Sequence, residues 1–236
     1  MIDIFGKALA AYQSGNYTEP IITLSSLDEE DEIPVPYLFR SFSEMPALEQ
    51  TALKLVKGTV LDVGCCAGSH SLYLQKQGVL VTALDESEGA IATCKARGIK
   101  DAVHHDFFTL PNTTTYDTLL LLMNGIGIAG KLKNINTFFN QAKQLLNPGG
   151  QLLLDSSDII YMYEAEDDGG YWIPNDGTYY GEVTYTLKYK NETGTPFSWL
   201  YIDYNTLQRA AIANGFACEL VAEGEHYDYL AKLTLL

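Results

Sequence analysis

The pattern of apolar and polar residues changes character at about residue 59. Before it, residues 3–14 place apolar side chains at helical spacing, and residues 46–57 begin with a proline and end before Gly58, so the pattern predicts two helices. Between them, residues 28–36 hold five consecutive acids and then two prolines, which are excluded from helix interiors and central strands. We therefore expect an irregular, solvated loop there.

From residue 59 onward, short β-branched or leucine-rich runs alternate with helical stretches. This alternation is typical of repeated βαβ units and a parallel sheet. The predicted strands lie at residues 60–63, 80–84, 118–123 and 151–154, and the predicted helices at residues 69–77, 87–97 and 135–146. Val103 alone is too short a signal to predict a strand, and residues 147–150 form a turn that separates the last helix from the last strand.

The last third of the chain predicts a hairpin and then a return to the sheet. Residues 181–190 alternate apolar and polar side chains, which is typical of a strand with one buried face, and residues 197–202 are its expected hairpin partner. A helix over residues 206–214, closed by Gly215, precedes two strands over residues 216–221 and 229–235.

Composition limits the class of protein and its partners. The length of 236 residues suffices for one large α/β domain or a domain with an added cap, but not for two full domains, and the composition of 47% hydrophobic and 19% charged residues predicts a packed core. A net charge of -15 would repel nucleic acid and anionic membranes, so the expected partner is a small molecule. The chain has neither a membrane-spanning apolar run nor a signal-peptide pattern at its start, so we expect a cytoplasmic protein. The sequence carries no signal for an oligomeric state.

The four cysteines are expected to be reduced thiols that serve mainly in packing. Cys65 and Cys66 are adjacent, with neither C-x-x-C spacing nor histidines at metal-ligand intervals, so no metal site is predicted.

A strand-turn-helix segment at residues 60–70 carries the candidate chemistry. Gly64 and Gly68 flank a turn where backbone N–H groups can meet a ligand at the carboxyl end of a strand. Asp85 ends the next strand, 21 positions after Gly64, where an acid can accept both hydroxyls of a ribose. The alternatives are an ordinary tight turn and an acid that caps the helix starting near Ser87. These features do not separate a nicotinamide cofactor from another adenosine-containing one.

With these residues in view, the sequence resembles the class I S-adenosylmethionine-dependent methyltransferases. Residues 62–68, Asp-Val-Gly-Cys-Cys-Ala-Gly, resemble the D-x-G-x-G-x-G turn of that family. Residues 104–108 resemble the segment after its third strand, and residues 145–150 resemble the L-K-P-G-G turn before its fifth. The resemblance implies a Rossmann-like α/β fold with seven strands, mostly parallel with the last strand antiparallel, and helices on both faces.

The resemblance also implies a division of the chain into four parts. Residues 1–58 are expected to form an N-terminal helical cap segment, and residues 59–156 the S-adenosylmethionine-binding core. Residues 157–203 are expected to form an inserted substrate cap with a β-hairpin, and residues 204–236 the helix and strands that complete the core sheet.

The implied activity is in-line transfer of the methyl group of S-adenosylmethionine to an unidentified small molecule. Because the cofactor supplies the activation, the protein mainly aligns the reactants, and no catalytic residue is predicted. The resemblance implies these cofactor-binding residues: Asp62, Gly64, Cys65, Cys66, Ala67, Gly68, His70, Asp85, Glu86, Asp106, Phe107, Asn124 and Gly125. Asp85 would hold the ribose, Asp106 with Phe107 the adenine, and Asn124 with Gly125 would face the sulfonium. Local alternatives are a turn cap for Asp106, a turn at Asn124-Gly125, and an exposed helix position for His70.

Substrate specificity is expected to come from the cap. Residues 157–201 are rich in aromatic side chains, at least half of which should form the core of a capping hairpin. The others could line a pocket for an aromatic or cationic acceptor. The candidates in this segment are Tyr161, Tyr163, Trp172 and Trp199. Tyr37 and Arg40, which lie outside it, are also candidates: they could close over the cofactor, with Arg40 pairing a carboxylate.

One departure from the family pattern concerns Cys66, which stands where the family usually has its middle glycine. A side chain there intrudes toward the methionine part of the cofactor, or strains the turn if the position needs a positive φ. This motivates an alternative function, a non-catalytic module that binds S-adenosylmethionine or S-adenosylhomocysteine. A nicotinamide-dependent oxidoreductase is disfavoured, because Ser71 replaces the third glycine and because of the turn at residues 147–150.

Overall fold

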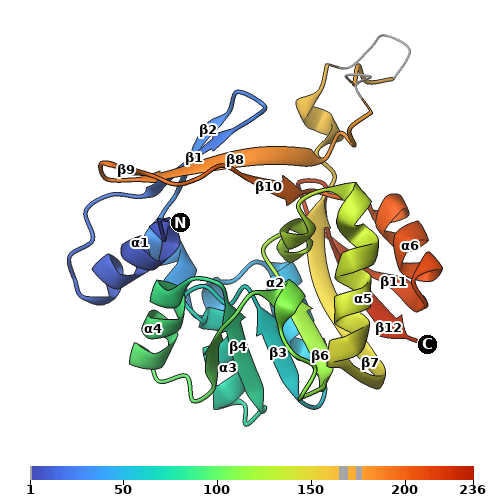
Figure 1. The fold of residues 1–236 in the computed structure, drawn as a ribbon, viewed down its shortest axis with the longest axis horizontal. Coiled ribbons are helices and arrows are strands. Elements are labelled where there is room, and N and C mark those ends of the chain that lie inside the picture. Colours follow the sequence, from blue (N-terminus) through green and yellow to red (C-terminus); the bar gives the residue numbers. More distant parts are fainter. Residues whose placement is uncertain (1, 165–169, 174–176) are drawn as a thin grey trace.

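Two sheets organise the protein. The computed structural model describes residues 2–164, 170–173 and 177–236. The larger sheet has seven strands in the order β11-β12-β7-β6-β3-β4-β5 (Figure 1). Their bounds are β3 Val60–Val63, β4 Val81–Asp85, β5 Ala102–His104, β6 Tyr116–Leu121, β7 Leu146–Ser157, β11 Phe216–Glu223 and β12 Asp228–Leu235. Strand β12 runs antiparallel to both of its neighbours, and the other pairs are parallel. The predicted fold class is confirmed.

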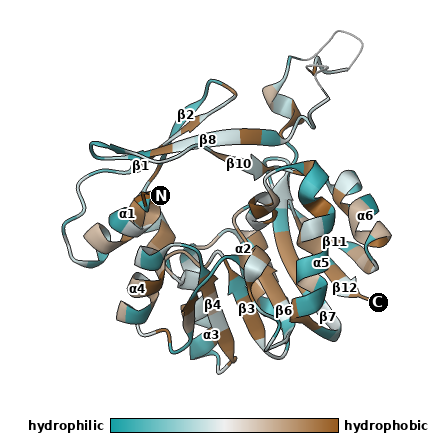
Figure 2. Cartoon of the chain, viewed as in Figure 1, coloured by the Kyte–Doolittle hydropathy of each residue, from teal (hydrophilic) through white to brown (hydrophobic). Residues whose placement is uncertain are grey.

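Helices cover both faces of this sheet because its central strands are apolar on both sides. All four residues of β3 are buried, and so are five of the six residues of β6. On one face pack α2 (Ala47–Leu55), α3 (Ser69–Lys76) and α4 (Glu88–Ala96). On the other pack α5 (Ile135–Leu145) and α6 (Tyr204–Ala213). Figure 2 shows the hydrophobic residues concentrated on the strands between these layers.

The strand order creates a crevice at the carboxyl edge of the sheet. Adjacent strands β3 and β6 are parallel, but the chain leaves β3 toward β4 and β5, and leaves β6 toward β7 on the other side. Loops that leave neighbouring strands in opposite directions open a space between them, which is where ligands bind in open α/β sheets. Asp85 and the turn after β3 both lie at this edge.

The smaller sheet contains strands from both segments of the expected cap, the N-terminal segment and the insertion. Its order is β10-β8-β1-β2, with β9 paired to β8. The bounds are β1 Ile21–Ser25, β2 Glu30–Ile33, β8 Glu182–Tyr189, β9 Glu192–Thr193 and β10 Phe197–Leu200. The predicted hairpin is confirmed, because β8 pairs with β10. Strand β1 pairs with the other edge of β8, so a segment near the N-terminus and the insertion share one sheet, which lies over the carboxyl edge of the larger sheet (Figure 1).

Three sequence predictions differ from the structure. The irregular loop predicted over residues 28–36 is wrong, because residues 30–33 form β2 and residues 35–39 a short 3-10 helix. The prolines follow β2 instead of lying within it, and its acids are exposed at the edge of the sheet. Strand β5 forms because β4 supplies its hydrogen-bonding partner. Strand β7 begins before the predicted turn at residues 147–150 and includes it. The helix predicted at residues 3–14 is confirmed as α1, Ile4–Gln13.

All four cysteines are free thiols, as predicted. The Sγ atoms of Cys65 and Cys94 lie 3.7 Å apart, and the hydrogen bond between them, together with burial, raises the pKa of Cys65. Burial also raises the pKa of Cys66. Both thiols therefore stay protonated near neutral pH and behave as packing groups.

Candidate active site

The turn after β3 adopts a left-handed backbone at three positions. The φ angles are 71° at Gly64, 51° at Cys66 and 76° at Gly68. A Cβ atom added to Gly64 would have no heavy atom within 4 Å, whereas one added to Gly68 would lie 2.2 Å from Cδ1 of Ile99. Gly68 is thus needed for packing, and Gly64 presents its backbone to open space, which a ligand can approach.

Cys66 occupies a position that requires a positive φ, a conformation that costs an ordinary residue about 1–2 kcal/mol. Its side chain packs against an apolar cluster that includes Leu38 and Ala8. Its backbone N–H donates a hydrogen bond to Oδ2 of Asp85 at 2.8 Å. The turn and the end of β4 are thereby tied together.

Asp85 ends β4 with a carboxylate that backbone groups hold in place. Its Oδ1 accepts a hydrogen bond from the N–H of Ser87 at 2.9 Å, in addition to the bond from Cys66. A carboxylate has about four acceptor positions, so both oxygens can still accept hydrogen bonds from hydroxyl groups. Burial raises the pKa of Asp85 to about 6, so the group is mostly ionised at neutral pH. The neighbouring Glu86 is exposed, and its carbonyl oxygen is hydrogen bonded to Nε2 of His104 at 2.9 Å.

A buried cluster of charges links three segments beside the turn. Arg40 follows the 3-10 helix at residues 35–39, Glu49 lies on α2, and His70 lies on α3. Nη2 of Arg40 is 2.5 Å from both carboxylate oxygens of Glu49, and Nε2 of His70 is 2.7 Å from Oε2 of Glu49. The prediction that His70 is exposed is wrong: its side chain is buried because Glu49 on α2 pairs with it.

The environment of this cluster stabilises the Glu49 carboxylate. Although burial raises its pKa, the hydrogen bonds and charges of His70 and Arg40 together lower it. In the part of the chain that the structure describes, Nε of Arg40 is buried without a hydrogen-bond partner. The Arg40 guanidinium also lies 4.0 Å from the ring centroid of Tyr37. One donor of a buried cation is therefore left for a further acceptor.

A cavity of about 390 Å³ opens at the carboxyl edge, beside this cluster. Polar side chains from α2, the end of β6, the end of β7 and the start of β12 line it: Glu49, Asn124, Asp155, Ser157, His226 and Asp228. Apolar and aromatic side chains complete the lining: Tyr37, Pro46, Leu48, Met123 and Tyr161. The cavity is predominantly acidic, with three carboxylates among its polar groups.

The structure brings some of the predicted substrate residues to this cavity. Tyr37 and Tyr161 line it, whereas Arg40, Tyr163, Trp172 and Trp199 are not among its described lining residues. The Tyr163 hydroxyl donates a hydrogen bond to the carbonyl oxygen of Tyr180 at 2.7 Å. Trp199, on β10, packs against Gly127 and so joins the small sheet to the core. Trp172 is 59% exposed.

Of the predicted cofactor residues, likewise, some line the cavity and others do not. Asn124 lines the cavity, and the neighbouring Gly125 is buried against Leu121. Asp106 caps a short 3-10 helix by accepting a hydrogen bond from the N–H of Phe108, and Phe107 packs in the main core.

Asp62 lies within β3 and is buried. Its Oδ2 accepts a hydrogen bond from the Ser71 hydroxyl at 2.6 Å. Burial raises the pKa of this carboxyl group. Within the described residues, Asp62 thus connects β3 to α3, beneath the turn that both flank.

Three carboxylates in the cavity were not predicted, those of Glu49, Asp155 and Asp228. Asp155 follows the leucine run at residues 152–154, as Asp85 follows the strand predicted at residues 80–84, so the rule applied there would have pointed to it, although β7 itself continues to Ser157. Glu49 carries no such signal. It is one acid on an amphipathic helix, and its role depends on Arg40 and His70, which are 9 and 21 residues away.

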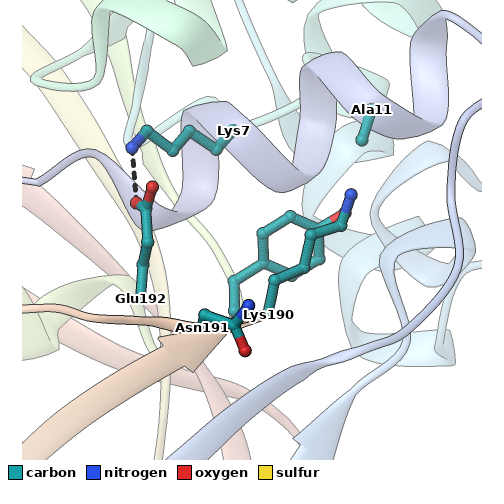
Figure 3. A pocket seen from close by; sticks show the side chains of 6 residues that line it. Lys7, Ala11, Lys190, Asn191 and Glu192 are labelled. Carbon is teal, nitrogen blue, oxygen red and sulfur yellow. Dashed lines mark hydrogen bonds and ion pairs between the residues drawn. The ribbon is translucent and has the colours of Figure 1, made fainter.

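A second cavity, of about 360 Å³, lies between α1 and the hairpin of the small sheet (Figure 3). It shares no lining residue with the cavity at Asp155. Lys7 on α1 forms an ion pair with Glu192 on β9 across it, and Lys190 and Asn191 lie on the hairpin side. Both charged groups of the pair are about half exposed.

We expect Lys7→Ala to change the free energy of unfolding by less than about 1 kcal/mol, because exposed ion pairs are screened by solvent. Urea unfolding in low and in 1 M salt checks this. A larger loss that disappears in salt would show that the pair holds α1 against the hairpin.

Comparison with known proteins places this site in a family. The model of a methyltransferase domain matches residues 60–150. A crystal structure of an S-adenosylmethionine-dependent methyltransferase from Bacteroides fragilis, in complex with S-adenosylhomocysteine, is 45% identical to this chain. It has a TM-score of 0.91, and the match covers 99% of this chain and 95% of that one. The chain belongs to the S-adenosylmethionine-dependent methyltransferases.

More distant relatives agree with this fold. Cypemycin N-terminal methyltransferase from a Streptomyces species is 29% identical over 113 residues, which are 47% of this chain and 46% of the relative. The chain matches about half the length of the curated relatives. CalS10, an amino pentose methyltransferase from Micromonospora echinaspora, has a TM-score of 0.59 at 16% identity over 85% of this chain and 94% of that one, which shows the fold alone. No described helix is long and apolar enough to span a bilayer.

Proposed function

We propose that this protein transfers the methyl group of S-adenosylmethionine to a small molecule held in the cavity of about 390 Å³. The observation that carries the proposal is that the cavity adjoins Asn124 at the same sheet edge as the turn after β3 and Asp85. The amino pentose methyltransferase of similar fold supports a small-molecule acceptor.

The residues at this edge fit the cofactor. Gly64 leaves an open space beside its backbone, which a side chain would fill, and Asp85 offers free acceptor positions for the ribose hydroxyls. The unpartnered Nε of Arg40 suits the carboxylate of the methionine part. Asn124 lines the acceptor cavity at the same edge of the sheet.

The chemistry that the cofactor supplies is a methyl group activated by a positively charged sulfur. The protein aligns the acceptor for in-line attack and excludes water, and this alignment provides most of its rate acceleration. Pro46, Leu48 and Met123 form the apolar part of the cavity wall that limits water there. Tyr37 and Tyr161 give two aromatic faces against which an acceptor can pack.

Isothermal titration with S-adenosylmethionine, followed by an assay of S-adenosylhomocysteine formation over a broad panel of small molecules, tests the proposal. We expect binding, and formation that depends on one class of acceptor. Absence of binding to the folded protein would contradict the assignment of the cofactor.

The alternative is a module that binds S-adenosylmethionine or S-adenosylhomocysteine without catalysis. The observation that favours it is the non-glycine residue Cys66 at a φ of 51° in the cofactor turn. Tight binding without turnover over the whole panel would support this alternative.

A further inference from the structure

We propose that Asp155 is a catalytic residue, which selects a protonated primary or secondary amine as the methyl acceptor and removes its proton before methyl transfer. This inference rests on the proposed function and names its substrate class. It is carried by the position of the Asp155 carboxylate, by its hydrogen bonds and by the charges that surround it in the cavity.

The position of Asp155 is fixed by the backbone of the neighbouring loop. Its Oδ1 accepts a hydrogen bond from the N–H of Asn124 at 2.9 Å, and Oδ2 accepts one from the N–H of Met123 at 3.2 Å. Met123 and Asn124 both have positive φ angles, 65° and 55°, so the loop bends sharply to present its N–H groups to Asp155.

These hydrogen bonds leave the carboxylate able to accept another. A carboxylate has about four acceptor positions, of which the N–H groups of Met123 and Asn124 use two. Asp155 lines the cavity together with Asn124, so the remaining acceptor positions can serve a ligand there.

The surrounding charges favour a cation at this place. Glu49 on α2 raises the pKa of Asp155, and His70 on α3 lowers it. Tyr37 faces Asp155 from the 3-10 helix at residues 35–39. On the β12 side, Asp228 and His226 line the same cavity.

The Arg40 cation is paired with Glu49, so the carboxylates of Asp155 and Asp228 are left to attract a positively charged ligand. Tyrosine faces at Tyr37 and Tyr161 also attract an ammonium group.

The pKa of Asp155 suits a group that takes up a proton. Burial and the charge of Glu49 raise this pKa to about 7, although the backbone N–H groups and His70 lower it. Carboxylates with such values are efficient general bases near neutral pH. A neutral alcohol acceptor would leave the acidic side chains of the cavity without a cationic partner.

Proton removal frees the electron pair with which the acceptor nitrogen attacks the methyl group. The ionised Asp155 takes one proton from the ammonium group, which leaves a neutral amine with a free electron pair. The nitrogen then bonds to the methyl carbon, while the electron pair of the carbon–sulfur bond stays on sulfur, giving the neutral thioether S-adenosylhomocysteine and an N-methylated ammonium product. The proton on Asp155 passes to solvent when the product leaves.

The first experiment identifies the atom that is methylated. The wild-type protein is incubated with S-adenosylmethionine labelled with ¹³C at the methyl group and with the small-molecule extract of its source organism, and the products are analysed by NMR. A labelled methyl group on nitrogen supports the proposal, and one on oxygen, carbon or sulfur overturns it. Failure to label any molecule overturns it together with the proposed function, whereas a label on another atom leaves the proposed function intact.

The second experiment tests Asp155 itself, with the unmethylated acceptor that corresponds to the labelled product of the first. In Asp155→Asn, an isosteric change that keeps an oxygen acceptor for the loop, kcat/KM at pH 7 should fall by about 100-fold or more. The dissociation constant of S-adenosylmethionine, measured by titration, should stay within about threefold. The matched control is Glu223→Gln, which makes the same chemical change at an exposed position at the end of β11 and should retain full activity.

A pH profile separates proton removal from a structural role. The reduction in kcat/KM of Asp155→Asn should become smaller as the pH rises past the pKa of the acceptor ammonium group, because the amine then binds in its neutral form. The role of Asp155 would be overturned by any of three results for Asp155→Asn. These are an unchanged kcat/KM, a reduction in kcat/KM that is the same at every pH, or a reduction that is explained by weaker cofactor binding.

Discussion

Asp85→Ala is expected to weaken the binding of S-adenosylmethionine by about 2–4 kcal/mol, which is roughly 30- to 1,000-fold, because two charge-assisted hydrogen bonds to the ribose are lost. The carboxylate ends β4 and is held by the N–H groups of Cys66 and Ser87, so its oxygens are already oriented before the ligand binds. Isothermal titration of the variant at pH 7.5 measures the loss.

Two companion variants make this result interpretable. Asp85→Asn keeps an acceptor oxygen for one of the two N–H groups and loses the charge, so its affinity should fall between those of the alanine variant and the native protein. Asp101→Ala is the control, because Asp101 is an exposed aspartate next to the opposite end of β5 and should leave the affinity unchanged. An unchanged affinity in Asp85→Ala would mean that the ribose binds elsewhere.

The pH dependence of the same binding gives an independent check. Burial raises the pKa of Asp85 to about 6, so the ionised form is present above that value and is lost as the pH falls through it. Affinity for S-adenosylmethionine should therefore weaken below about pH 6 in the native protein. In Asp85→Asn, this part of the pH dependence should be absent.

The core of the fold could be predicted because each of its elements is specified locally. The runs at β3, β6 and β7 are apolar enough to be buried on both faces, and glycines follow the helices that separate them. The small sheet was only half predicted. Strand β1 pairs with β8, more than 150 residues away, and β2 is mostly acidic and pairs with β1. Pairing at such separation leaves no local pattern in the sequence.

The site shows the same distinction between local and distant signals. Asp85 and the turn at residues 64–68 could be predicted, because both lie within one continuous βαβ segment, in which the turn follows β3 and Asp85 ends β4. The pairing of Arg40 with Glu49 and His70 could not, since three separate segments bring these residues together. A buried arginine and an exposed one look identical in the sequence, and so do a buried and an exposed histidine.

Glu49→Gln is expected to destabilise the protein by about 3–5 kcal/mol at pH 7, because removing one partner of a buried ion pair leaves the other charge uncompensated. Glu49 is 3% exposed and Arg40 is 6% exposed, so water cannot replace the lost carboxylate. The same change leaves one acceptor oxygen, where the carboxylate has two, for Arg40 and His70 together. Urea unfolding of the variant and the native protein, monitored by circular dichroism, gives the difference in the free energy of unfolding.

The sign of the pH dependence distinguishes this cause from a packing defect. The pKa of Glu49 is lowered in the folded protein: burial raises it, but His70 and Arg40 together outweigh burial. The stabilisation is therefore fully present above the unfolded-state value of about 4.3, and it is lost as the pH falls through the lower folded value. The difference in the free energy of unfolding between Glu49→Gln and the native protein should therefore become smaller at acidic pH, whereas a difference caused by a packing defect would persist. Glu29→Gln, at an exposed position in the turn between β1 and β2, should show neither effect.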